Sequence, residues 1–589
     1  MDTEKNLKAL QEELVRKNIK AYYITPSDEH NSEYVPSKYL QERLAFCPFT
    51  GNDGTLLVTQ DNAYLFTDGR YFIQAEKELK GSSVNLIKLN TAGYPSLEEL
   101  IYSKDLFPFA TNFKRISAEQ AKNIIPDNPA MLVNADFSYL VDIKEEKHNS
   151  LLWGLGPDLS ALTRDEKVNF IRDIFKKLKA HSYLITDLTD IAYVLNLRGN
   201  DIPCTPVFYS FLYIDDNSIH LFIDFEKYDI DKKRRPDLMG IDIHPYNEIY
   251  DFFNNKQDTV VLYDPRFVNY ELSRKILRSI TGPNVTRLYK SVKRGIEIKN
   301  IQDIHVLDGV AMVKFIKYVY EHKNDGLTEC ELAKQLEQFR LEEDRCFDLS
   351  FESIVAVDAN AAEMHYSPTE SNCSKIDKNS TVLLVDSGGQ YYGGTTDITR
   401  TFILKKPSDE LRYDYTLTLK AVINLSDTIF MEGCTGQNID IKAREIMWRE
   451  GMDYKCGTGH GVGYMLSVHE GPNSFRYAQS PNGDKSAILV EGMVTTIEPG
   501  VYKANKYGIR IENELNCVNY NRSETDLFLT FECVTCCPIE TKYLDLDLLT
   551  DSEIEYLNGY HDWVLSRLTP YFTGDDLEFL KKLCAHVKR

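Results

Sequence analysis

The feature that most restricts the fold is a repeat within the first 225 residues of the chain. Each copy has a short apolar strand, a Gly-Asn-Asp tripeptide and then two strands joined at an Asp-Asn turn. Three matches in the same order predict two similar α/β domains, with chance likeness between strand-turn-strand units as the alternative. The matched segments are AYYITPSD (21–28) with SYLITDLT (182–189), Gly51–Asp53 with Gly199–Asp201, and GTLLVTQDNAYLFTD (54–68) with FYSFLYIDDNSIHLFID (208–224).

Helix signals set the boundaries of the predicted domains. Thr163-Arg-Asp-Glu166 is a capping box followed by apolar residues at helical spacing, so the second copy begins near residue 156. After the basic stretch KSVKRG (290–295), a long helical pattern runs through Ile301 and Val313. We therefore predict a mixed α/β (α+β) chain with domains at residues 1–155, 156–292 and 293–589.

Charge and hydropathy exclude several classes of protein. The chain has 89 Asp and Glu against 68 Lys and Arg, a net charge of −21, so we expect no binding to nucleic acid or to an anionic membrane surface. No apolar run approaches the roughly 18 residues that a membrane span needs. The charged, amphipathic opening MDTEKNLKALQEEL is unlike a secretory signal, so we expect a cytoplasmic protein.

Acidic residues occupy facing positions on two predicted hairpins of the third domain. Each hairpin consists of apolar strands with one acid on each arm, and carboxylates held so close repel unless they share a proton or a cation. For any single acid, a solvated or capping carboxylate is the alternative. The first hairpin, TVLLVDSGGQYYGGTTDITRTFIL (381–404), carries Asp386 and Asp397, and the second, MVTTIEPGVYKANKYGIRIENEL (493–515), carries Glu498 and Glu512.

A glycine-rich segment between the hairpins supplies histidines. CGTGHGVGYMLSVHEGP (456–472) contains His460 and His469, and its glycines allow the backbone to approach a site closely. Four carboxylates and one imidazole form an oxygen-rich ligand set. Such a set suits a pair of Mn²⁺-like ions better than a structural Zn²⁺ site, which prefers Cys and His.

These motifs resemble the dinuclear metallopeptidases of the pita-bread fold, and within them the long, three-domain cytosolic aminopeptidases P, or Xaa-Pro aminopeptidases. The resemblance spans nearly the whole chain and implies two creatinase-like N-terminal domains followed by a pita-bread catalytic domain. The matching phrases are TDGRYFIQAEK (67–77), NLRGNDIPCTPVF (196–208), MHYSP (364–368), VDSGGQYYGGTTDITRTF (385–402), GTGHGVG to VHEGP (457–472), IEPGVY (497–502) and GIRIEN (508–513).

The resemblance implies a metal centre and an activity. It implies that Asp386 binds one of two Mn²⁺ ions, that His460 and Glu498 bind the other, and that Asp397 and Glu512 bridge both. The implied substrates are peptides with proline in the second position, from which the enzyme releases the N-terminal residue. A homodimer is implied as well.

Further residues take roles from the same resemblance. It implies that His365 and His469 are catalytic residues outside the ligand set, and that Glu498 also shuttles a proton. Substrate contacts are implied for Arg70, His365, His460, His469 and Arg510.

One position departs from the family pattern, and two other functions stay open. Cys456 stands where these enzymes usually have a histidine four residues before the ligand histidine, which puts the local polar network in doubt.

Prolidase, which cleaves Xaa-Pro dipeptides with the same metal set, is the first alternative, but it lacks the second repeat copy. A metal-free pita-bread binding module is the second, but such modules have lost ligands that this chain retains.

Overall fold

The computed structural model of the chain describes residues 2–35, 37–124, 129–144, 151–227, 235–370, 372–478 and 486–589. Two compact units, Met1–Thr286 and Arg287–Arg589, make up the fold, and each is described by itself. Over the described ranges, no helix is both long and apolar enough to cross a membrane.

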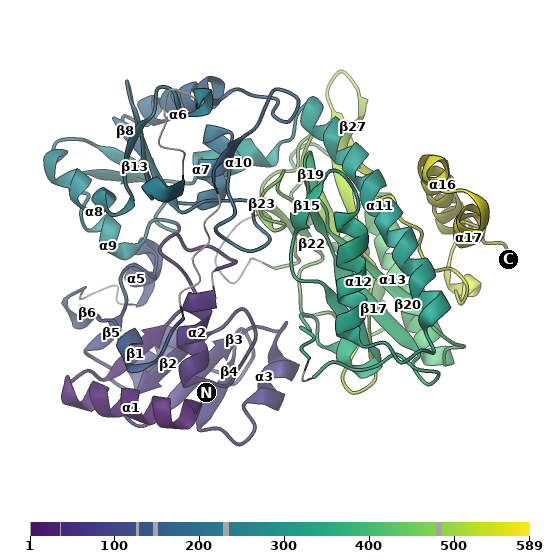
Figure 1. The fold of residues 1–589 in the computed structure, drawn as a ribbon, viewed down its shortest axis with the longest axis horizontal. Helices are drawn as coiled ribbons and strands as arrows, with labels where there is room; N and C mark the ends of the chain where they lie inside the picture. Colours follow the sequence, from purple (N-terminus) through teal and green to yellow (C-terminus); the bar gives the residue numbers. More distant parts are fainter. Residues whose placement is uncertain are drawn as a thin grey trace. The chain divides into compact units, whose positions relative to one another are not determined.

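The first unit contains two six-stranded mixed sheets with the same topology, which confirms the predicted repeat (Figure 1). In both sheets the first strand along the chain pairs antiparallel with the hairpin that follows it and parallel with a later strand. In sheet order, the first sheet is β4 (Val84–Lys88), β3 (Ala63–Thr67), β2 (Thr55–Thr59), β1 (Ala21–Ile24), β5 (Phe109–Thr111) and β6 (Leu132–Asn134). The second is β12 (Asp242–Pro245), β11 (Ile219–Ile223), β10 (Ser210–Asp215), β8 (Ser182–Ile185), β13 (Val261–Tyr263) and β14 (Ser279–Thr281).

Two helices of the first unit form where the sequence predicts them. Helix α1 (Thr3–Arg16) buries Leu7, Leu10 and Leu14 in one core, and α6 (Arg164–Lys177) begins at the Thr163 capping box. A two-stranded sheet joins β7 (Trp153–Gly154) to β9 (Leu197–Arg198). The other helices are α2 (Ser37–Phe46), α3 (Phe72–Glu78), α4 (Leu97–Ser103), α5 (Ala118–Ile124), α7 (Leu188–Leu195), α8 (Ile249–Phe252), α9 (Tyr270–Ser273) and α10 (Val285–Ser291), the last of which ends inside the second unit.

The second unit is built on small antiparallel sheets. Its main sheet has the order β21-β28-β27-β24-β22-β23, and the strands β16, β17 and β20 form a second one. Their bounds are β16 (Ile354–Val357), β17 (Val382–Ser387), β20 (Ile398–Ile403), β21 (Phe430–Met431), β22 (Gly459–Gly461), β23 (Glu470–Phe475), β24 (Val494–Ile497), β27 (Asn513–Arg522) and β28 (Leu527–Cys533). Two shorter sheets consist of β15 (Cys346–Leu349), β18 (Gly389–Tyr391) and β19 (Gly394–Thr395), and of β25 (Gly500–Lys503) and β26 (Tyr507–Arg510).

Helices cover these strands and bury the core. The long helix α11 (Ile296–His322) and α12 (Glu329–Leu341) run beside each other (Figure 1). They pack apolar side chains against β16, β17 and β20. Helix α13 (Asp409–Ser426) and the C-terminal helices α16 (Asp551–Leu568) and α17 (Gly574–Leu583) complete a second core with β17 and β20. The remaining helices are α14 (Gly436–Ile439) and α15 (Ile441–Arg449).

A single buried arginine connects β20 to the C-terminal region. Arg400 is 1% exposed, and its guanidinium donates to the backbone oxygens of Glu512, Cys537 and Pro538. It also donates to the hydroxyl of Tyr560 on α16, at 3.1 Å. Helix α16 is thereby held against the strands that carry the acidic residues.

Candidate metal centre

Strand register brings the four acids of the two hairpins together, as the sequence predicts. In the first hairpin Asp386 pairs with Thr399, so Asp397 lies just before β20 on the facing arm. In the second, Ile497 pairs with Asn513, and the next position on each arm is Glu498 and Glu512. We call Asp386, Asp397, Glu498 and Glu512 the acid cluster.

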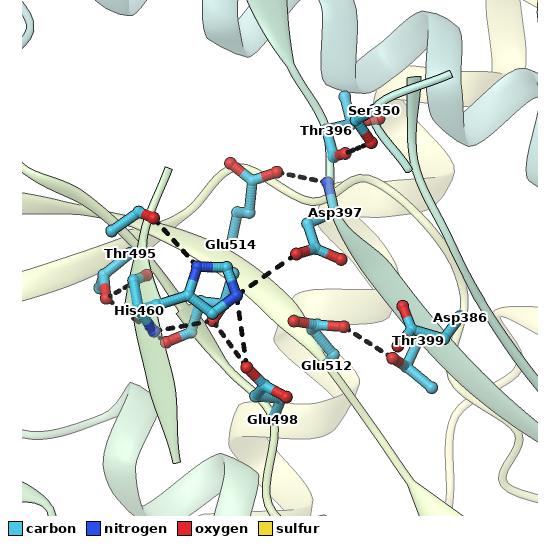
Figure 2. Close-up of polar contacts among 12 residues, drawn as sticks. Ser350, Asp386, Thr396, Asp397, Thr399, His460, Thr495, Glu498, Glu512 and Glu514 are labelled. Carbon is cyan, nitrogen blue, oxygen red and sulfur yellow. Dashed lines mark hydrogen bonds and ion pairs between the residues drawn. The ribbon is translucent and has the colours of Figure 1, made fainter. Parts of the chain in front are cut away.

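Two hydrogen bonds at Thr399 join the hairpins. The Glu512 N–H donates to the Thr399 carbonyl oxygen at 3.1 Å, and the Thr399 hydroxyl donates to Glu512 Oε2 at 2.6 Å. Figure 2 shows the side chains of the cluster converging from the two hairpins, which lie about a hundred residues apart in the sequence. Asp397 and Glu512 are almost completely buried.

His460 faces this cluster from β22. Its neighbour Gly459 lies so close to β24 that a Cβ atom there would sit 2.0 Å from the Thr496 carbonyl oxygen, so only glycine fits at this position. The His460 Nδ1–H donates to the Gly461 carbonyl oxygen at 2.9 Å, since a carbonyl can only accept. Nε2 faces Asp397 Oδ2, 3.5 Å away, and Glu498 Oε1, 3.4 Å away, and in the neutral ring that a metal ion requires it directs its lone pair at them (Figure 2).

The electrostatics of the cluster fit a bound cation. Burial raises the pKa of Asp397 well above its ordinary value, and the charges of Asp386 and Glu498 raise it further. Burial likewise raises the pKa of Glu512, with Asp397 as the next cause. Ligand atoms of Asp397, His460 and Glu512 all lie within 4.8 Å of one another, and buried Asp386 Oδ1 accepts no hydrogen bond from any described residue. A lone pair and an unbonded carboxylate oxygen in one acidic, buried space are donors suited to a hard or borderline metal ion.

Arg510 supplies positive charge beside the acid cluster. Its guanidinium donates to Asp386 Oδ2 at 2.6 Å, to the Tyr502 hydroxyl at 2.7 Å and to the Thr399 hydroxyl at 3.1 Å. These contacts orient Asp386. The substrate contact implied for Arg510 stays a prediction.

Two buried residues behind the cluster were missed by the sequence reasoning. Glu514 Oε1 accepts the Asp397 N–H at 2.6 Å and lies 3.2 Å from His305 Nε2 on α11. Burial alone would lower the pKa of His305, but the charge of Glu514 outweighs it and the pKa is raised. Glu514 could have been found, because residues two apart on a strand share a face with Glu512. No sequence signal distinguishes His305 from a structural core histidine.

Of the other predicted site residues, His365 and His469 lie in the second unit and Arg70 lies in the first. The ring of His469 stands edge-on to that of His460, with centroids 4.3 Å apart, and half-buried His365 follows Met364, whose carbonyl oxygen lies 3.5 Å from Arg510 Nη2. Arg70 belongs to the first unit, where its guanidinium is paired with Asp68 and Asp53 at 2.7 Å each. The implied contact of Arg70 with substrate stays a prediction.

Comparison with protein families identifies the parts of the chain. Residues 299–518 match metallopeptidase family M24, and residues 527–587 match the C-terminal region of that peptidase family. Residues 6–128 and 143–297 each match the creatinase/prolidase N-terminal domain.

Individual relatives match over nearly the whole chain. A probable Xaa-Pro aminopeptidase P of Coprinopsis cinerea is 34% identical, covering 99% of this chain and 98% of its own. The crystal structure of an X-prolyl aminopeptidase from Caenorhabditis elegans, described as a cytosolic enzyme with a di-nuclear active site, superposes with a TM-score of 0.92 at 31% identity and covers both chains completely. A Bacillus anthracis Xaa-Pro dipeptidase shares the fold alone, at 23% identity and a TM-score of 0.52, and covers 64% of this chain and 99% of its own.

Proposed function

The chain belongs to the Xaa-Pro aminopeptidases of metallopeptidase family M24, and we propose that the acid cluster and His460 form its dinuclear metal centre. The enzyme is a metallo-aminopeptidase that releases the N-terminal residue from peptides with proline in the second position. The prolidase alternative does not fit, because the dipeptidase match leaves more than a third of the chain uncovered. The observation that carries the metal proposal is that His460 Nε2 faces the buried carboxylate of Asp397 and the half-buried carboxylate of Glu498.

Two Mn²⁺ ions are the cations that we propose for this centre. Asp386 would hold one ion, His460 and Glu498 the other, and Asp397 and Glu512 both. Carboxylate oxygens and one imidazole are ligands that Mn²⁺ accepts, and no thiol takes part. When bound, such a pair supplies an activated water and polarises the carbonyl of the scissile bond.

The side chains around the centre would carry the proton and charge transfers. The Xaa-Pro bond is a tertiary amide without an N–H, so the proline nitrogen must receive a proton before it leaves. Glu498, at the edge of the cluster, would take a proton from the attacking water and pass it to that nitrogen. His469 and His365 would donate hydrogen bonds to the oxyanion that develops on the carbonyl.

The carboxylates of the proposed centre would also select the substrate. The free α-amino group of the peptide would meet the carboxylate of Asp397, which restricts removal to one residue at a time. Arg70 and Arg510 are proposed to contact the peptide as well. We further propose a cytoplasmic location, supported by the description of the C. elegans relative, and a homodimer, which light scattering of the purified protein would test.

The function is tested with peptides of the Arg-Pro-Pro type, with and without added Mn²⁺. We expect Mn²⁺-dependent release of the first residue and much slower turnover of an Xaa-Pro dipeptide. Full activity after exhaustive chelation would contradict the metal centre, and preference for the dipeptide would contradict the aminopeptidase. A protein without stoichiometric metal and without turnover would instead be a binding module.

A further inference from the structure

Two cysteines of the second unit lie opposite each other where α12 begins. A short antiparallel ladder joins the residues before α12 to the segment that ends at Ile376, because Thr328 pairs with Lys375 and the Glu329 N–H donates to the Ser374 carbonyl oxygen at 3.0 Å. Cys330, the second residue of α12, and Cys373 adjoin this pair of residues, and their thiols are hydrogen-bonded to each other. Thiols in contact need only a small movement to reach the sulfur separation of about 2.05 Å that a disulfide requires.

The same ladder holds the segment that carries His365. The Tyr366 hydroxyl donates to Glu329 Oε2 at 2.8 Å, and the Ser374 N–H donates to the same oxygen at 2.6 Å. Asn360 Nδ2 adds hydrogen bonds to Glu329 Oε1 at 3.0 Å and to the Ser374 hydroxyl at 2.9 Å. Completely buried Glu329 therefore connects Cys330 directly to the residue that follows His365.

We propose that Cys330 and Cys373 are a reversible oxidation site whose disulfide slows peptide turnover by displacing His365. A low-molecular-weight disulfide such as oxidised glutathione is the oxidant. One cysteine thiolate attacks it and releases one glutathione thiol, and the second cysteine then displaces the other glutathione. The protein loses two thiol protons and two electrons, and one glutathione disulfide becomes two thiols.

The bond geometry explains the effect on turnover. The sulfurs of a disulfide are about 2.05 Å apart, shorter than any hydrogen bond between thiols, so closure draws the Cys373 segment toward α12. Misplacing a catalytic group by about 1 Å can cost up to about 10² in rate. Through Tyr366 and Glu329, the movement reaches His365.

The kinetics of closure follow from the surroundings of Cys330. Burial raises the pKa of its thiol to about 11, and the hydrogen bond with Cys373 contributes as well. The Cys330 thiolate is therefore scarce at neutral pH, and closure accelerates as the pH rises. Oxidation at pH 8.5 is the practical condition for a test.

The test oxidises the full-length, metal-loaded enzyme with oxidised glutathione and maps disulfides by mass spectrometry of unreduced peptides. We expect a peptide pair linked through Cys330 and Cys373, together with a loss of kcat of at least threefold that dithiothreitol restores. In the Cys330→Ser and Cys373→Ser variants we expect unchanged basal activity, no link and no loss of kcat. Cys434→Ser, a partly buried cysteine elsewhere in the unit, is the matched control and should behave as the native enzyme does.

Three results would overturn the proposal. They are no Cys330–Cys373 link although other cysteines carry glutathione, a link with unchanged kcat, and an equal loss of kcat in both serine variants. The effect on turnover rests on the proposed role of His365, whereas the link does not. An enzyme inactive before oxidation would therefore count against the proposed function, while the peptide map would still decide whether the site exists.

Discussion

Replacing Asp397 by Asn should change how metal binding depends on pH. In the metal-free protein the raised pKa of Asp397 and of Glu512 means that the cluster holds protons well above the ordinary carboxyl pKa of about 4. A metal ion binds carboxylates only after these protons leave. Each displaced proton makes the metal affinity rise about tenfold per pH unit, which is about 1.4 kcal/mol.

The magnitude follows from the two buried carboxyls. If both are protonated, the affinity of the native enzyme rises up to about a hundredfold per pH unit. Asp397→Asn removes one titrating group and also the charge that, after burial, raises the pKa of Glu512 most. Metal binding to the variant should therefore release at least one proton fewer, and its metal affinity should rise about tenfold per pH unit or less. Turnover should be abolished and metal content lowered, with the fold intact.

The protons held by Asp397 and Glu512 also determine whether the free energy of unfolding of the metal-free protein rises or falls with pH. The folded, metal-free chain binds more protons than the unfolded chain at any pH between the ordinary and the raised carboxyl pKa. Its free energy of unfolding therefore falls as the pH rises through that window, whereas a carboxylate paired with a cation behaves in the opposite way. The metal-free Asp397→Asn variant should lose less stability over the same window.

The assay is competition with a coloured chelator between pH 6 and 8, together with calorimetry in two buffers of different ionisation enthalpy, which counts released protons. Asp258→Asn removes the same charge from a fully exposed position and should keep the native pH dependence. A native enzyme that binds metal without releasing protons would refute the reasoning. So would an Asp397→Asn variant with the native slope.

Further substitutions separate ligands from supporting residues. His469→Ala should keep two metals per chain by elemental analysis while turnover falls about 10²-fold, whereas His460→Ala should lose metal; metal loss in His469→Ala would contradict its role as an oxyanion donor. Burial raises the pKa of the Cys456 thiol to about 12, and Glu498 contributes, so the thiol should resist peroxide in a Cys330→Ser background, and Cys456→His should leave activity within several-fold. Thiol-reversible inactivation that Cys456→Ser abolishes would show that this thiol is reactive. His305→Gln removes one partner of a buried ion pair and should cost about 3–5 kcal/mol, measured as a lower denaturant midpoint; an unchanged midpoint would show that Glu514 does not need the charge.

The sequence predicts the acid cluster well because a hairpin fixes which residues face each other. The alternation of side chains and the turn positions determine that Glu498 meets Glu512, and the register of β24 with β27 confirms this. The repeat is predicted for the same reason, since each copy contains its own Asp-Asn hairpin. Each hairpin depends on contacts between residues that are near each other in the sequence, whereas the joining of the two acid-bearing hairpins at Thr399 does not.

The supporting residues could not be predicted because their contacts are distant in the sequence. His305 meets Glu514 from a helix whose pattern shows only that the residue is buried, and Arg400 finds its partners in the C-terminal region. The contact between Cys330 and Cys373 depends on a ladder at the start of a helix, where capping signals dominate the sequence. Such positions follow from tertiary packing, which no local pattern encodes.

The buried Arg400 has a consequence for the order of events during synthesis. The residues of the acid cluster have all left the ribosome once Glu512 is clear, yet the hydroxyl that Arg400 contacts belongs to Tyr560, roughly fifty residues later. At about 5–20 residues per second, the chain spends about 2–10 s with its four acids made and this arginine still short of a partner. Arg400 gains this last partner only when α16 is made, so we expect the proposed metal centre to reach its final packing only after the last helices of the chain are synthesised.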